Sequence, residues 1–212
     1  DLAWRALSLT LVLLDTNAYL RLAKRVRPAV GVVFGQKGYV LTIHKSVEDE
    51  VHRSARLKSL YPWFDGQEFA NERLAKQVRL LEEEKASVQA AQSVLHGWVL
   101  SDPKSYTSGG RSPPGSTDCW RLALAQVKSA IVVTDDLGMH TLANDFGIDI
   151  WHGYELLDKL RSAKVVDGPL IREIFEALET NGDLPKSWLE AKHAVFLKIF
   201  GPRSKWTHSR ST

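Results

Sequence analysis

Four acidic residues occupy comparable positions in this chain, each close to the end of an apolar run or to the start of a helical pattern: Asp15, Glu50, Asp118 and Asp136. Carboxylates that are crowded together repel, and each resists ionising beside the others. A divalent cation offsets this repulsion, and hard cations such as Mg²⁺ take oxygen ligands and commonly hold phosphate as well. Such a cation can activate a water for attack on a phosphodiester. If the four acids meet, we expect a metal-dependent hydrolytic site.

Each acid also has a structural explanation when it is taken singly. Asp15 and Asp136 can each cap the helix that follows. Asp118 can complement the positive end of its own helix, and Glu50 can lie on the surface. Asp135 competes with Asp136 for its role if the preceding strand ends one residue earlier.

The elements that must position these acids follow an α/β alternation. The apolar run 9–14 indicates a strand buried on both faces, as in a parallel sheet. Further strands are expected at 39–43, 130–133 and 147–150, and residues 30–34 form either a loop or an edge strand. Helical patterns separate the strands, so a central parallel sheet is the default. In such sheets ligands bind outside the carboxyl ends of the strands, and two of the acids follow strands there.

The rest of the chain is helical apart from one long loop. The longest helical pattern covers 66–98 and is interpreted as one helix or as two with a break near Ser87. Residues 101–115 are rich in Ser, Gly and Pro, and loops of this length are usually functional or disordered. We expect this loop to overhang the third acid. We predict an α/β domain over 1–151 and a helical C-terminal extension with a basic tail over 152–212.

Composition bears on the cellular compartment of the protein but does not indicate its activity. The chain has 212 residues and a formal net charge of +3, a mild basicity that is compatible with nucleic acid and common elsewhere. Cys119 is the single cysteine, so no intrachain disulfide forms and a cytoplasmic setting is favoured. We interpret it as a core residue. The apolar run ending at Leu14 is far shorter than the ~20 residues of a membrane span and precedes no cleavage-site pattern, so we expect no membrane association.

Five short motifs stand in order along residues 9–150: VLLDTN from Val12, VEDEV from Val47, TDCWRLALA from Thr117, IVVTDD from Ile131 and GI from Gly147. In this order, and in these strand and helix contexts, they resemble the motifs of PIN-domain proteins. The greatest similarity is to the VapC-like toxin ribonucleases of toxin–antitoxin pairs. The resemblance implies a three-layer α/β/α domain with a central parallel sheet.

The resemblance also implies a quartet of catalytic acids that bind Mg²⁺ or Mn²⁺: Asp15, Glu50, Asp118 and Asp136. Three neighbours would orient these ligands or stand at variable positions beside them: Asn17, Thr134 and Asp135. Glu48 and Asp49 are weaker candidates than Glu50, because only Glu50 immediately precedes the apolar Val51 as the family pattern has it.

The activity that this resemblance implies is cleavage of RNA by an endoribonuclease toxin, which would have an antitoxin partner and could form a homodimer. A basic face on the first helical pattern, with Arg21, Lys24 and Arg25, is either solvated or guides the RNA. The long loop and the C-terminal segment depart from the simple toxin. Two alternatives therefore stay open: an RNA-processing nuclease without an antitoxin, and a scaffold that binds RNA or protein without cutting. The basic tail after Gly201, with Trp206, is either a solubilising segment or a further RNA contact.

Overall fold

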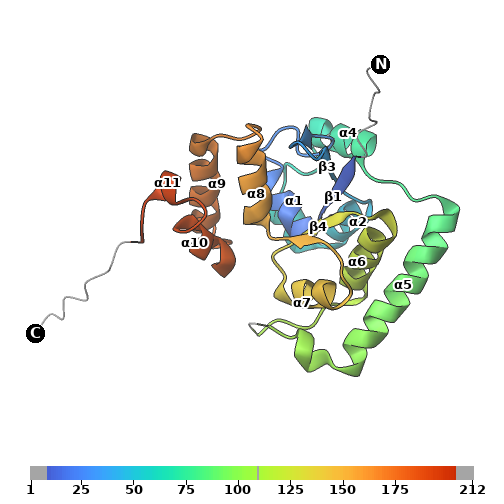
Figure 1. The fold of residues 1–212 in the computed structure, drawn as a ribbon. Coiled ribbons are helices and arrows are strands. Elements are labelled where there is room, and N and C mark those ends of the chain that lie inside the picture. Colours follow the sequence, from blue (N-terminus) through green and yellow to red (C-terminus); the bar gives the residue numbers. More distant parts are fainter. Residues whose placement is uncertain (1–8, 109, 204–212) are drawn as a thin grey trace, which may run out of the picture.

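The computed structural model describes residues 9–108 and 110–203, which form a sheet between two layers of helices (Figure 1). The sheet has five strands in the order β2-β3-β1-β4-β5. Strand β1 pairs in parallel with β3 and β4, β4 pairs in parallel with β5, and the edge strand β2 is antiparallel to β3. This mostly parallel sheet flanked by helices confirms the predicted fold class. The strands are β1 Thr10–Leu14, β2 Val33–Phe34, β3 Tyr39–Thr42, β4 Ile131–Val133 and β5 Ile150–Trp151.

Helices cover both faces of the sheet. One layer and its margin contain α1 Thr16–Leu22, α2 Ser46–Arg53, α3 Ala55–Leu60, α4 Gln67–Lys76, α8 Gly153–Ser162, α9 Gly168–Thr180, α10 Lys186–Lys192 and α11 Leu197–Phe200. The other contains α5 Glu82–Ser101, the 3₁₀ helix η1 Pro103–Tyr106, α6 Ser116–Lys128 and α7 Leu137–Asp145. Within the described ranges no helix is both long enough and apolar enough to cross a membrane.

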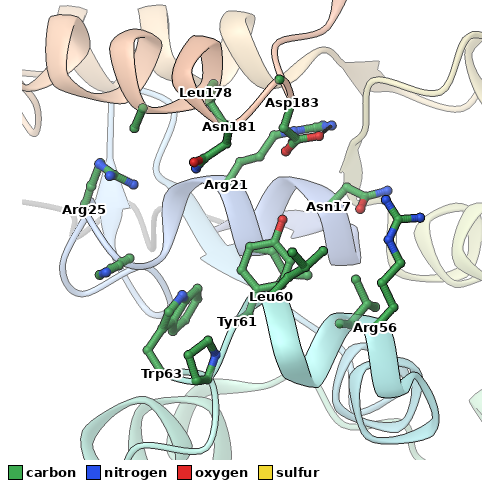
Figure 2. A pocket seen from close by; sticks show the side chains of 16 residues that line it. Asn17, Arg21, Arg25, Arg56, Leu60, Tyr61, Trp63, Leu178, Asn181 and Asp183 are labelled. Carbon is green, nitrogen blue, oxygen red and sulfur yellow. Dashed lines mark hydrogen bonds and ion pairs between the residues drawn. The ribbon is translucent and has the colours of Figure 1, made fainter.

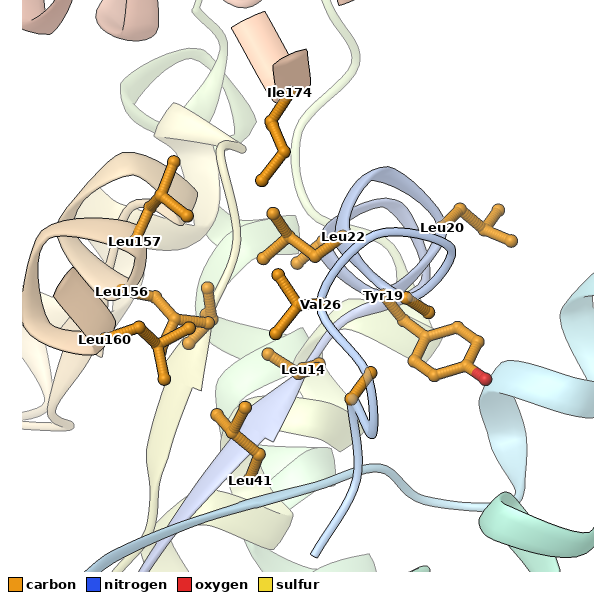
Figure 3. Packing of buried hydrophobic residues seen from close by; sticks show 14 of the residues in the cluster. Leu14, Tyr19, Leu20, Leu22, Val26, Leu41, Leu156, Leu157, Leu160 and Ile174 are labelled. Atoms are coloured by element: carbon orange, nitrogen blue, oxygen red, sulfur yellow. The ribbon is translucent and has the colours of Figure 1, made fainter. Parts of the chain in front are cut away.

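The central strand β1 shows why its sequence is apolar without alternation. Successive side chains of a strand point to opposite faces. Val12 and Leu14 join the hydrophobic cluster under α1 and α8, and Leu13 joins the cluster under α5 and α6. A strand with helices on both faces has no polar side to present to water. Figure 3 shows Leu14 and Leu41 of the sheet beneath the leucines of α1 and α8.

The C-terminal segment packs on the sheet. Leu156, Leu160 and Ile174 are fully buried in the same cluster as Val12 of β1. The predicted boundary at residue 151 stays a prediction, and the two parts of the chain share one hydrophobic cluster across it. Trp206 of the basic tail lies outside the described residues.

The longest predicted helix is two helices, and its break lies earlier than the sequence pattern suggests. Helices α4 and α5 are separated at residues 77–81, whereas Ser87 lies inside α5. Val78 pairs in parallel with His44, and its N–H donates to the carbonyl of Ile43 at 2.8 Å. This pairing requires extended backbone, so the chain leaves the helix where it passes the end of β3.

Candidate active site

A cavity of about 200 Å³ lies where β1 and β4 end, and all four predicted acids line it. Asp15 directly follows β1, and Asp136 follows β4 after two intervening residues. Glu50 comes from α2, and Asp118 comes from the first turn of α6. Because β1 and β4 are parallel, with Leu14 opposite Val133, their carboxyl ends meet at one edge of the sheet. Segments distant in sequence thus bring their carboxylates to one place, and metal binding by them stays a prediction.

Asp15 is both a helix cap and a cavity residue. Its side chain is buried, and Oδ1 accepts the N–H of Ala18 at 2.5 Å, which caps α1. Oδ2 accepts the hydroxyl of Thr134, also at 2.5 Å. Burial raises the pKa of Asp15 to about 6, while the charge of Arg121 and the two hydrogen bonds act in the opposite direction. Asp15 therefore caps α1 and also contributes its carboxylate to the cavity.

An arginine side chain, whose role the sequence motifs did not indicate, also lines the cavity. Arg121 of α6 has a side chain only 7% exposed, and it donates to a carboxylate oxygen of Glu50. It also donates to Thr16 Oγ1 at 2.8 Å and to Asp118 Oδ1 at 3.3 Å. The spacing from Asp118 to Arg121 was a usable signal, because residues three apart lie on the same face of a helix.

The balance of charge in the cavity is negative. Five carboxylates line it against three guanidinium groups: Asp15, Glu50, Asp118, Asp135 and Asp136 against Arg21, Arg111 and Arg121. Burial raises the pKa of Asp118, with further upward contributions from Asp136 and Glu50. The hydrogen bond from Gly115 and the charge of Arg121 act in the opposite direction, but the pKa of Asp118 stays raised overall. The excess of two carboxylates is what one divalent cation would offset.

The donor set suits a hard cation, but the present side-chain positions do not form a closed metal site. Carboxylate and hydroxyl oxygens are the ligands that Mg²⁺ prefers. Within residues 9–108 and 110–203, however, no three Asp, Glu, His or Cys side chains are grouped to hold one ion. Arg121 is bonded between Glu50 and Asp118, so a cation would have to replace it at these acids.

Asp136 faces the cavity while it caps α7. Its Oδ1 accepts the N–H of Met139 at 2.9 Å, and its own N–H donates to Thr134 Oγ1 at 3.2 Å. Among the described residues its Oδ2 has no hydrogen-bond donor. Thr134 therefore links the two acids that follow β1 and β4.

Asp135 also lines the cavity, but its hydrogen bonds go to the C-terminal helices. Its side chain is 4% exposed and bonds with Arg21 at 3.1 Å. Its oxygens accept Trp188 Nε1–H at 3.0 Å and the N–H of Gly153 at 3.1 Å. Burial acts to raise the pKa of Asp135, but the neighbouring His152, Arg21 and these hydrogen bonds outweigh it and lower the pKa. Asp135 thus ties the sheet edge to α8 and α10, which leaves Asp136 as the better ligand candidate.

Of the three neighbouring acids Glu48, Asp49 and Glu50, only Glu50 lines the cavity. Glu48 bonds with the buried Arg73 at 2.8 Å and does not line the cavity, and Asp49 is exposed. Asn17 lines the cavity but is exposed, and no hydrogen bond joins it to Asp15 in the described part of the chain. Its expected role in orienting Asp15 is instead filled by the backbone of α1 and by a threonine.

The basic face predicted on the first helix is only partly solvated. Arg21 is 9% exposed and makes two 3.0 Å hydrogen bonds with Asp183, so it is a structural residue. Arg25 bonds with the exposed Glu173, and Lys24 is exposed.

Cys119 is buried in the core, where burial raises its pKa to about 11.

Comparisons with known proteins do not identify the function of this chain. No protein-family model and no curated protein sequence matches this chain. Among solved structures, the crystal structure of FitAcB from Neisseria gonorrhoeae is similar over 68% of this chain and 98% of that chain. The identity is 14% and the TM-score is 0.44. A likeness of this degree carries no inference about activity.

Proposed function

We propose that this protein is a metal-dependent endoribonuclease of the PIN-domain type. The observation that supports the proposal is the convergence of four acids, from four separate elements, on one cavity with more carboxylates than guanidinium groups. Asp15, Glu50, Asp118 and Asp136 would hold Mg²⁺ or Mn²⁺. When bound there, the ion would polarise a water and neutralise charge on the scissile phosphate.

The side chains of the cavity suit the remaining tasks of phosphodiester hydrolysis. Thr134 and the N-terminus of α1 hold Asp15 rigidly from two sides. We assign Arg121 to the phosphate, because its buried Nε–H has no acceptor among the described residues. A planar guanidinium binds phosphate through paired hydrogen bonds.

Cleavage of a structured RNA by the purified protein with Mn²⁺ tests this function. We expect Asp15→Asn to lower the rate by about 100-fold or more, because loss of a group that only orients a metal ligand already costs ~10–100-fold and Asp15 would be a ligand itself. Asp149→Asn is the matched control, because Asp149 is exposed and lies outside the cavity. Absence of cleavage by the wild type, or equal cleavage by Asp15→Asn, would show that the protein is not a nuclease of this kind.

The setting that the motif resemblance supports is a cytoplasmic toxin whose antitoxin covers the acidic cavity. A small neighbouring gene, whose product inhibits the cleavage, would support this pairing over an RNA-processing role. A homodimer stays a prediction.

One observation favours a second candidate, a scaffold that binds RNA without cutting it. Arg121 already neutralises part of the charge on Glu50 and Asp118, as expected of a site that needs no metal. RNA binding without cleavage in the same assay would select this candidate.

A further inference from the structure

A second cavity, of about 630 Å³, adjoins the acidic one (Figure 2). It lies between α1, the end of α3 with the turn after it, and the C-terminal end of α9. Its volume falls within the range of ~300–1,000 Å³ that is typical of small-molecule sites. Four cations and one carboxylate line it: Arg21, Lys24, Arg25 and Arg56 against Asp183.

The two cavities share part of their walls. Asn17 and Arg21 line both of them. In Figure 2, Asn17 and Arg56 lie at one end of the larger cavity, and Arg25 lies toward the other. A strand whose phosphate enters the acidic cavity would therefore continue past Asn17 and along α1.

Two of the cations are available to phosphate. Arg21 is held by Asp183 and Asp135, and Arg25 by Glu173. Lys24 and Arg56 are exposed, and neither has an ion-pair partner within the described ranges. Cations along a groove bind a nucleic-acid backbone by displacing its counterions.

The wall between these cations is aromatic and apolar. Tyr61 and Trp63 are half-buried and meet edge to face, with ring centroids 6.1 Å apart. Leu60 beside them is 56% exposed, so its apolar surface is open to a ligand in the cavity. Bases of single-stranded RNA stack on such aromatic faces, while the cations contact the phosphates. An acidic peptide would use the cations but would leave the aromatic wall uncovered.

We propose that this second cavity binds the single-stranded RNA next to the scissile bond. Bases lie against Tyr61 and Leu60, and phosphates contact Lys24 and Arg56. The end of α9 completes the cavity, so the C-terminal helices form part of the substrate site. This inference rests on the proposed ribonuclease function, which supplies the identity of the strand.

Fluorescence anisotropy with a labelled single-stranded RNA in EDTA measures this binding without cleavage. We expect Lys24→Ala with Arg56→Ala to weaken binding about tenfold and to reduce the salt dependence by about 0.7 in log–log slope per lost contact. Tyr61→Leu should weaken binding about fivefold or more through lost stacking, and Tyr61→Phe should retain it. The matched control is Lys58→Ala, because Lys58 is exposed on the same helix as Arg56 but lies outside the cavity.

Wild-type affinity in the double variant, or an equal loss in Lys58→Ala, would overturn the proposal. Displacement of the RNA by polyglutamate at equal charge would overturn it too, because the cavity would then recognise acidic chains in general. The two proposals fail separately. RNA binding that depends on Lys24 and Arg56, without Mn²⁺-dependent cleavage, rejects the nuclease but supports the second cavity as an RNA site. Normal cleavage and binding by the Lys24 and Arg56 variants rejects the RNA cavity but supports the nuclease.

Discussion

Replacing Asp15 by asparagine should stabilise the protein at pH 7 when no divalent cation is present. Burial is the largest cause that raises the pKa of Asp15 from 3.8 to about 6. Between these pH values the folded protein keeps a proton that the unfolded chain releases. The free energy of unfolding therefore falls as the pH rises from about 4 to 6, and it stays lower above that range. An amide has no charge to desolvate and still caps α1.

The size of this effect follows from the shift in pKa. About two pKa units correspond to ~3 kcal/mol, at ~1.36 kcal/mol per unit. The amide side chain of the variant would present an NH₂ group where Oδ2 of Asp15 now accepts the hydroxyl of Thr134, and the rearranged hydrogen bond offsets part of the gain. We expect Asp15→Asn to raise the free energy of unfolding by ~1–3 kcal/mol at pH 7.

Urea denaturation between pH 4 and pH 7.5 in EDTA measures the effect. The difference between Asp15→Asn and the wild type should be near zero at pH 4 and should grow through pH 6. Asp135→Asn is a control of opposite sign. The pKa of Asp135 is lowered, so its charge stabilises the fold above the unfolded pKa, and this stability is lost as the pH falls. Added Mn²⁺ should stabilise the wild type more than Asp15→Asn.

Two results would refute this reasoning. In EDTA at pH 7, Asp15→Asn could be no more stable than the wild type, or its difference from the wild type could be independent of pH. Either result would mean that burial does not oppose the ionisation of Asp15 in the folded protein.

Two further predictions concern groups that the structure places around the cavity. Arg121→Met should cost ~1–3 kcal/mol in EDTA, between the values for exposed and buried ion pairs, because Glu50 and Asp118 are 38% and 33% exposed. The same variant should bind Mn²⁺ more tightly in calorimetry, and unchanged affinity would mean that Arg121 does not compete with a cation. Trp188→Phe removes a donor to Asp135 and should cost ~1.5–3 kcal/mol at pH 7. Thermal melts should show a smaller loss at pH 4, where Asp135 is closer to protonation, and an equal loss would argue against a charged acceptor.

Local sequence patterns were sufficient to locate the central strands and two of the acids. The apolar run of β1 predicts a strand with no polar face, and the structure places helices on both of its sides. Parallel strands end at the same edge, so the positions of Asp15 and Asp136 after two such strands imply their proximity. These inferences depend only on residues close together in sequence.

The break at residues 77–81 could not be located in this way. The helical spacing of apolar residues continues across it, but Val78 pairs with His44 at the end of β3. A strand-like contact between distant segments outweighed the local pattern, because it satisfies backbone hydrogen-bonding groups at the edge of the sheet.

The role of each charged group in the cavity likewise came from tertiary contacts. Asp135 and Asp136 are adjacent in sequence and both line the cavity, yet the carboxylate of Asp135 bonds to Trp188 of α10, whereas that of Asp136 caps α7. Arg21 belongs to a basic helical face, but its side chain is only 9% exposed and is paired with Asp183. Burying a charge is costly unless a partner meets it, and Asp183 and Trp188 of the C-terminal segment supply partners here. The order of residues along the chain thus indicated which acids could form a site, and the packing of α8 and α10 determined that Asp135 is engaged in structural hydrogen bonds.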